Sequence, residues 1–407
     1  MTSVRIAWRN LWRNGRRTTL ALLAIGLSVT LVLAYNGMLR GYSDWMLETI
    51  TGPMLGHVQV HAPKWRETRD MDRTLDDVES LVAALRRDPA VVDVNARIYA
   101  PALAALGEEG FAVIVIGVDL AEETRPQRLL TGAAQTLGPG QVLMGDQLAR
   151  QMGVKAGDVI ALVGQAADGS LANDLFTVVA PARTAVDFIN RQGVIMSLDQ
   201  AQTLFAMPGE AHEIMVHARH PEDVPALVDR LRALPAFRGT EILDWKTLAP
   251  QMVALIGIVQ IAWWLVLVLV FVAAASGVAN TMLMATFERT HEFGMLLALG
   301  TTPRRLVWMT TLEAVALGLI GAACGTAAGV ALVAWTHRTG VDFARLTGGG
   351  PSELTSFGMI WSLTFYPTLL PVDVVRVIAA VVITSLLAAA WPAIRVARLQ
   401  PARALRD

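Results

Sequence analysis

The segment Gly277–Gly300, GVANTMLMATFERTHEFGMLLALG, decides how this chain is organised. It begins at the end of a long apolar run, because no charged residue occurs between Lys246 and Glu288. Such a run is long enough for a helix that crosses a membrane. Four later residues have the i, i+3, i+4, i+7 spacing of one helix face: Phe293, Leu296, Leu297 and Gly300. The pattern predicts a short amphipathic helix between two membrane-spanning helices, with its apolar, small-residue face open to a partner.

The ends of this short helix also have sequence signals. Gly300 is a typical helix stop, and Thr302–Pro303 has the chemistry of an N-cap followed by the first residue of the next helix. The pattern alone is also compatible with an ordinary loop between two helices.

Composition argues against a wholly soluble protein. The chain has 407 residues, of which 54% are apolar, and a mean hydropathy of +0.46. We expect four membrane-spanning helices from its apolar runs, over residues 18–40, 251–286, 304–336 and 374–395. Residues 287–303 connect the second and third of these and contain the short amphipathic helix.

The first seventeen residues are rich in arginine beside an apolar stripe. The stripe is Val4, Trp8, Leu11 and Trp12, at helical spacing. Residues 1–17 are therefore predicted to form an amphipathic helix on an anionic membrane surface. A cleavable signal peptide is the alternative, but the following apolar run of residues 18–39 is longer than a usual signal core.

Charge is unevenly distributed along the chain and predicts its topology. Residues 41–250 hold 28 acidic and 18 basic residues, a net charge of −10, whereas the remainder holds 7 acidic and 16 basic residues, a net charge of +9. Short basic segments stay on the cytoplasmic side. We therefore expect residues 41–250 and a loop at residues 337–373 to lie outside, with both termini and the tail at residues 396–407 in the cytoplasm.

Residues 41–250 alternate between strand-like and helix-like patterns, which predicts an α+β domain. Strands are expected at Val58–His61, Val91–Tyr99, Phe111–Val118, Val142–Met144, Asp158–Leu162, Glu213–Ala218 and Glu241–Leu243. Helices are expected at Leu75–Arg87, Asp146–Met152 and Val224–Leu234. The carboxylates of this domain are most simply explained as a solvated surface.

Glu313 is the one acidic residue inside a predicted span, and an intramembrane carboxylate is a candidate functional site. The favoured alternative is a structural bond to a neighbouring helix or to Arg304 or Arg305. Small residues recur along the same helix and predict close helix packing, within the chain or with a second chain, at Gly318, Gly321, Gly325 and Gly329. Tyr35, Met38 and Trp263 are candidate contacts for the acyl chains of a substrate, although such residues more often contact lipid or the protein core.

Motifs for catalysis are absent from the sequence, so no catalytic residue is predicted. There is no G-x-x-x-x-G-K-[ST] motif, which excludes ATP hydrolysis by a P-loop on this chain. The run from His212 to His217 has one residue too many for H-E-x-x-H, and on a strand its two histidines face opposite ways. His57 and His61 would share a strand face but stand about 13 Å apart, too far to hold one metal ion. The single Cys324 allows no intramolecular disulfide.

Three segments resemble one protein family, the FtsX/MacB-type ABC transporter permeases. They are NTMLMATFERTHEFGMLLALGTTPRRL at residues 280–306, VLMGDQLARQMGVKAGDVIAL at residues 142–162 and WPAIRVARLQPARAL at residues 391–405. The first resembles the coupling helix that seats in a groove of a separate ATPase subunit. The resemblance therefore implies that the ATPase-coupling residues are Glu288, Arg289, Glu292, Phe293, Gly294, Leu296, Leu297 and Gly300. The second resembles part of a periplasmic core domain, and the third resembles the C-terminal signature of the family.

The resemblance also implies a fold and a set of partners. The fold is a membrane α-helical protein with four transmembrane helices and an α+β extracytoplasmic domain between the first two, in the bacterial inner membrane. The implied partners are an ABC ATPase dimer, a second copy or a related permease, membrane lipids, and a lipoprotein with its periplasmic carrier, but no nucleic acid. No cofactor is expected on this chain, because ATP and Mg belong to the ATPase.

The layout resembles most closely the permeases that release lipoproteins from the inner membrane. MacB proteins carry their ATPase on the same chain, and this sequence has no P-loop. Efflux of peptides, toxins or drugs, as in MacB systems, is one alternative. FtsX-like signalling to a cell-wall hydrolase is another, and a sensor domain without transport is the last.

Overall fold

The computed structural model describes residues 15–123, 128–130, 137–342, 353–356, 359–362 and 364–397. The chain divides into two compact units. The helical unit comprises Met1–Asp44, Leu255–Phe343 and Thr364–Asp407, and the α/β unit comprises Trp45–Ala254 and Ala344–Leu363. The predicted amphipathic helix at residues 1–17 and the predicted tail at residues 396–407 fall almost entirely outside the described residues.

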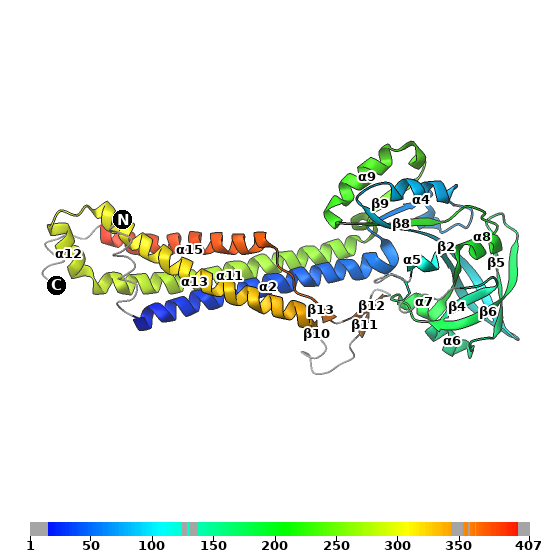
Figure 1. The fold of residues 1–407 in the computed structure, drawn as a ribbon, viewed down its shortest axis with the longest axis horizontal. Coiled ribbons are helices and arrows are strands. Elements are labelled where there is room, and N and C mark those ends of the chain that lie inside the picture. Colours follow the sequence, from blue (N-terminus) through cyan, green and yellow to red (C-terminus); the bar gives the residue numbers. More distant parts are fainter. Residues whose placement is uncertain are drawn as a thin grey trace. The chain divides into compact units, whose positions relative to one another are not determined.

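Four helices of the helical unit are long and apolar enough to cross a membrane, and they lie side by side (Figure 1). They are α2 (Gly15–Ile50), α11 (Pro250–Glu288), α13 (Pro303–Thr339) and α15 (Pro371–Ala397). A helix satisfies all its backbone hydrogen bonds internally, which lipid requires. The predicted fold class, four apolar helices with a mixed α and β domain between the first two, is confirmed.

The helices pack through small and branched side chains in a core that includes Ile25, Val29, Leu317 and Val381. Large apolar side chains point away from this core along α11, where Ile261 is 70% exposed. Such an apolar exterior is unfavourable in water and is normal for a helix in lipid.

The α/β unit is built on one nine-stranded sheet with the order β3-β7-β4-β6-β5-β2-β8-β1-β9 and a further pairing of β3 with β2. Its strands are β1 (Val58–His61), β2 (Val91–Leu106), β3 (Glu109–Val118), β4 (Gln141–Gly145), β5 (Val159–Gln165), β6 (Leu171–Ala182), β7 (Gly193–Ser197), β8 (Glu213–Ala218) and β9 (Glu241–Asp244). The pairings close six strands, from β2 around to β3, into a ring. β2 also continues, through β8 and β1, into an open sheet that ends at β9.

Helices of the α/β unit are short and lie in the connections between strands (Figure 1). They are α3 (Trp65–Thr68), α4 (Val78–Arg86), α5 (Leu120–Glu123), α6 (Asp146–Met152), α7 (Asp187–Gln192), α8 (Leu198–Leu204), α9 (Val224–Ala233) and α10 (Trp245–Leu248). The π-helix η1 (Thr51–Leu55) follows α2, and 3-10 turns occur at Pro221–Asp223 and Pro235–Phe237.

All ten predicted elements of this unit are present, and β1, β8 and α6 have the predicted bounds. The prediction missed β6, α7, β7 and α8, and it ended the second strand at Tyr99 although β2 continues to Leu106. Pro101 lies within the missed part of β2 and pairs with Ile114 of β3. A proline argues against strand in sequence, but here the pairing of two long strands in the ring outweighs that local preference.

The predicted outer loop at residues 337–373 contains short strand pairs. β10 (Val341–Asp342) pairs with β13 (Thr364–Phe365), and β11 (Glu353–Ser356) pairs with β12 (Met359–Ser362). The first pair belongs to the helical unit and the second to the α/β unit.

Candidate functional site

The connection between α11 and α13 contains the helix α12 (Thr290–Ala298). Its end is a Schellman motif: the Thr301 amide donates to the Leu296 carbonyl at 2.9 Å, and the Gly300 amide donates to the Leu297 carbonyl at 3.0 Å. Gly300 has φ +90°, which glycine adopts without strain. Thr302 is the N-cap residue of α13 and Pro303 its first residue, so both predicted helix ends are confirmed.

The sequence predicted that the apolar face of α12 is exposed to a partner, and this prediction is wrong for Phe293. This side chain is 2% exposed and packs against Leu306 of α13, with Leu296 and Leu297 half-buried around it. The reason is tertiary: the chain reverses at Gly300, which turns this face of α12 onto the first turn of α13. Gly294 is also buried.

The exposed face of α12, with the C-cap residue Leu299, is formed by residues that the sequence did not single out. His291, Met295 and Leu299 follow one another at four-residue spacing, and Leu299 is 83% exposed. The spacing of Phe293, Leu296 and Leu297 correctly predicted one apolar helix face, but that face packs against Leu306 of the same chain.

Arg289, at the start of α12, binds two carboxylates. Its Nη1 lies 3.2 Å and 3.0 Å from the two carboxylate oxygens of Glu313, and its Nε lies 3.3 Å from Oε2 of Glu292. The guanidinium carbon also lies 5.1 Å from the centre of the Phe293 ring. Glu313 therefore has the bonded partner that its structural role requires, but this partner is Arg289 and not Arg304 or Arg305. Arg304 and Arg305 are exposed. Glu288, the last residue of α11, is exposed.

The small-residue face of α13 packs against other helices of the same chain. A Cβ atom on Gly321 would lie 2.7 Å from Cγ2 of Ile25, and one on Gly325 would lie 2.7 Å from Cβ of Val29, both in α2. Gly329 faces Leu33 of α2, whereas Gly318 faces Ser385 of α15. The Thr30 hydroxyl donates to the Gly325 carbonyl at 3.1 Å, which is possible only because the two helices approach closely.

Trp263 lines a pocket of about 570 Å³ in the helical unit. Arg40 of α2 forms an ion pair with Asp373 of α15 at 3.4 Å in its wall. The other lining residues are Asn36, Leu39, Ser43, Asp44, Val259, Gln260, Trp264 and Arg376. Tyr35 and Met38 are half-buried on α2 and are not among the residues that line this pocket.

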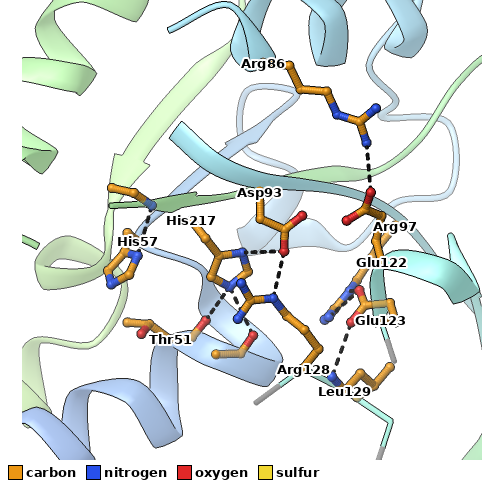
Figure 2. Close-up of polar contacts among 12 residues, drawn as sticks. Thr51, His57, Arg86, Asp93, Arg97, Glu122, Glu123, Arg128, Leu129 and His217 are labelled. Carbon is orange, nitrogen blue, oxygen red and sulfur yellow. Dashed lines mark hydrogen bonds and ion pairs between the residues drawn. The ribbon is translucent and has the colours of Figure 1, made fainter. Parts of the chain in front are cut away.

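The α/β unit contains a buried polar layer that sequence analysis missed (Figure 2). Asp93 of β2 accepts a hydrogen bond from Nε of Arg128 at 2.8 Å. Nε2 of His217 in β8 donates to the carbonyls of Thr51 and Gly52 at 3.1 Å each, and its Nδ1 lies 3.7 Å from Asp93. These bonds join η1 to the sheet.

The second part of this layer is an ion pair with both side chains fully buried. Nε of Arg97 in β2 donates to Glu123 of α5 at 2.6 Å, and Glu123 also accepts from the Leu129 amide at 3.3 Å. Asp93 and Glu213 are each 3% exposed as well. The expectation that the carboxylates of this domain form a solvated surface is therefore wrong for Asp93, Glu123 and Glu213.

Burial dominates the titration of this layer. Burial, and next the Arg128 charge, lower the pKa of His57 to about 4 and that of His217 to about 3. Burial would raise the pKa of Asp93, but hydrogen bonds with Glu122 and Arg128 outweigh it and lower that pKa. The His217 ring is thus neutral near pH 7 and holds η1 as a hydrogen-bond donor.

The histidines do not converge. His212 accepts from the Tyr99 amide at 3.1 Å and stacks on Trp65, whereas His57 accepts from the Ala218 amide at 3.1 Å. Among the described residues, no group of three or more His, Cys, Asp or Glu side chains is placed to hold a metal ion.

Comparison with known families gives two matches. Residues 264–401 match the family described as FtsX-like permease C-terminal, and residues 18–234 match the family described as MacB-like periplasmic core domain. The second match alone spans more than half of the chain.

Individual relatives have low identity but long coverage. The chain is 23% identical over 405 residues to the lipoprotein-releasing system transmembrane protein LolC of Neisseria meningitidis serogroup B, covering 96% of this chain and 94% of LolC. It is 22% identical over 405 residues to LolE of Haemophilus influenzae, covering 94% and 92%. A 138-residue part is 34% identical to the macrolide export ATP-binding/permease protein MacB of Shewanella oneidensis, covering 34% of this chain and 18% of that protein.

These matches explain the two units. The helical unit carries the permease, the α/β unit is a periplasmic or extracellular domain of a multi-pass membrane protein, and neither matched family is an ATPase domain. Membership of the permease family implies an ATPase partner. The chain therefore belongs to the FtsX/MacB family of ABC transporter permeases.

Proposed function

We propose that this chain transmits ATP-driven motion from a separate ATPase dimer to its periplasmic α/β unit, and that it thereby releases lipoproteins from the bacterial inner membrane. The carrying observation is the similarity to LolC and LolE, which spans more than nine-tenths of this chain, whereas the similarity to MacB spans about a third. A second copy of this chain or a related permease completes the assembly.

The ATPase binds the exposed face of α12. Met295 and Leu299 are exposed apolar side chains on the short connection between two membrane-spanning helices. An apolar patch at such a place is unfavourable in water unless a partner covers it. Burying one such side chain contributes roughly 1.5–3 kcal/mol, so the loss of one anchor weakens binding about tenfold or more.

The bonds of Arg289 make α12 move together with α13. Its contacts with Glu313 in α13 and with Phe293 in α12 bind the two helices at their junction. Behind them, Gly321 and Gly325 hold α13 against α2, which continues into the α/β unit at Trp45. Motion of α12 thus passes to α13 and α2 through the contacts of packed helices.

The cargo contact is assigned to the pocket at Trp263. A lipid-anchored cargo needs an apolar surface for its acyl chains and a polar surface for the peptide that carries them. This pocket has both, with Trp263 and Trp264 beside Arg40 and Arg376. Tyr35 and Met38 of α2 are proposed to contact the acyl chains, although they are not among the residues lining this pocket.

The test of coupling is a charge on the exposed face of α12. We expect Leu299→Asp or Met295→Asp to abolish co-purification of the ATPase and its stimulated turnover, while the protein inserts in the membrane at the wild-type level. Thr302→Asp is the matched control, because it adds the same charge to the same connection at an exposed N-cap. Wild-type ATPase binding by Leu299→Asp would exclude this face as the docking site.

The test of cargo is separate. Proteoliposomes that contain the chain, the ATPase that co-purifies with it and an acylated lipoprotein are given ATP and a soluble lipoprotein carrier. We expect lipoprotein to move to the carrier fraction, and Leu299→Asp to stop it. ATP turnover without transfer would overturn lipoprotein release and leave the coupling proposal intact, and efflux of peptides or drugs would then be the next function to assay.

A further inference from the structure

The α/β unit contains a cavity of about 440 Å³. Its apolar wall is contributed by η1, β2, β3 and α7, through Met54, Leu55, Pro101, Ile114 and Phe188. This volume lies in the range of sites that bind small ligands, and a mostly apolar lining with a few polar groups is typical of them.

Two guanidinium groups line this cavity. Arg69 lies over the ring of buried Trp65, with its Cζ 4.2 Å from the ring centre, and Arg66 is half-buried nearby. Among the described residues, no carboxylate lies within ion-pair distance of either arginine. Burial, and next the charge of Arg69, lower the pKa of Arg66, and the charges of Glu213 and Glu241 offset this only in part.

A buried carboxyl group also lines the cavity. Glu213 of β8 is 3% exposed, and its Oε1 has no hydrogen-bond partner among the described residues. The buried cation Arg97, whose charge acts on Glu213, is already bound to Glu123 at 2.6 Å. A buried polar atom without a partner costs free energy, and a ligand that bonds to it would recover that cost.

We propose that this cavity binds an anionic amphiphile, with its carboxylate or phosphate head group at Arg66 and Arg69 and its alkyl chain against Met54, Leu55 and Phe188. The two arginines exclude a cationic head group, because a single buried carboxyl group does not balance them. The head group then supplies an ion-pair partner for both guanidinium groups, and Glu213 in its protonated form donates to it.

Binding of this ligand weakens as pH rises. Burial raises the pKa of Glu213 to about 7, so the carboxyl group is neutral below that value and repels an anion above it. The charged and titratable groups around Glu213 are Arg66 of α3, Arg69 at the end of α3, Arg97 and Tyr99 of β2, Glu123 of α5, and His61 opposite it in β1.

The experiment uses the full chain in nanodiscs and a diazirine derivative of dodecanoate as probe. We expect photolabelling, mapped by mass spectrometry, at Met54, Leu55 or Phe188. Arg66→Ala/Arg69→Ala should reduce this label about tenfold, since charge-assisted hydrogen bonds are lost. The matched control is Arg73→Ala/Arg150→Ala, which removes two arginines of the same unit that pair with Asp70 and Asp146 outside the cavity.

Competition identifies the head group. Excess dodecanoate or a lysophospholipid with the same chain should remove the label, and which of them acts at lower concentration distinguishes a carboxylate from a phosphate ligand. Labelling of the wild type should decrease between about pH 6 and pH 8.5, whereas the Glu213→Gln variant should be labelled equally across this range. Equal label in the Arg66→Ala/Arg69→Ala variant, or equal competition by dodecyltrimethylammonium, would overturn the proposal.

Discussion

At the scale of single residues, the α/β unit is defined by charged side chains that lie where apolar ones are usual. Arg97 and Glu123 are fully buried, and Asp93, Glu213 and His217 are nearly so. A buried charge is tolerated when it is paired and hydrogen-bonded, as Arg97 is by Glu123. Glu213 lacks such a partner, so its burial favours the neutral carboxyl group.

Replacement of Glu213 by glutamine should therefore stabilise the α/β unit at high pH. The folded-state pKa, about 7, lies above the ordinary value of 4.5, so the wild-type contribution is favourable below 4.5 and is lost as pH rises through 7. At about pH 8 the variant should be more stable by roughly 3 kcal/mol, from 1.4 kcal/mol per pKa unit. Below about pH 4.5 the two proteins should have equal stability.

Hydrogen exchange of the β8 amides in nanodiscs, at both pH values, measures this difference. Glu222→Gln is the control, because Glu222 is exposed in the same unit and its replacement should change stability at neither pH. A Glu213→Gln variant that is less stable than wild type at pH 8 would mean that the carboxylate has a partner in solution.

At the scale of elements, α13 is the helix on which the helical unit depends. It contacts α2 through Gly321, Gly325 and Gly329, contacts α15 through Gly318, and binds the start of α12 through Glu313. Because lipid supplies no hydrophobic driving force between helices, this packing depends on how closely the backbones approach. The glycine spacing in the sequence predicted close helix packing, but the sequence did not indicate that α2 is the helix that packs against Gly321, Gly325 and Gly329.

A large side chain at Gly325 should separate α13 from α2. The nearest atoms to a new Cβ are the Gly26 backbone and Cβ of Val29, none of which can rotate away. We expect Gly325→Leu to destabilise the helical unit by about 1–3 kcal/mol or more, seen as a lower unfolding temperature in detergent. Gly277→Leu in α11 is the control, since nothing lies within 4 Å of its Cβ position. Equal unfolding temperatures for the two variants would contradict the α2–α13 contact.

At the scale of the whole molecule, the charge distribution predicts which parts share one side of the membrane. The acidic segment at residues 41–250 includes most of the α/β unit, and the basic segments are the chain ends and the residues around α12, with Arg289, Arg304 and Arg305. The family describes the α/β unit as periplasmic, and we infer from charge that both termini and α12 are cytoplasmic.

Cysteine labelling tests this topology in a Cys324→Ala background. Asp168→Cys, in an exposed turn of the α/β unit, should react with an impermeant thiol reagent in intact spheroplasts. His291→Cys, on the exposed face of α12, should react only after the membrane is permeabilised. Labelling of both positions in sealed spheroplasts would rule out the four-span arrangement.

Sequence alone determined the features that depend on local pattern and composition. The length of the apolar runs predicted four spans, Gly300 and Pro303 predicted the ends of α12 and α13, and β1, β8 and α6 were found with their bounds. These features follow from hydrophobic length, backbone geometry and side-chain periodicity, which act over a few neighbouring residues.

Only the tertiary structure decided which face of each element is covered. Phe293 is hidden because the chain turns back on α13, and Leu299 is exposed for the same reason. The carboxylates of this domain were expected to lie on a solvated surface, yet Asp93 and Glu123 are buried, because their partners Arg128 and Arg97 come from residues far away in the sequence. Periodicity in the sequence indicates that the two faces of a helix or strand differ, and the packing of distant segments determines which face is exposed to water.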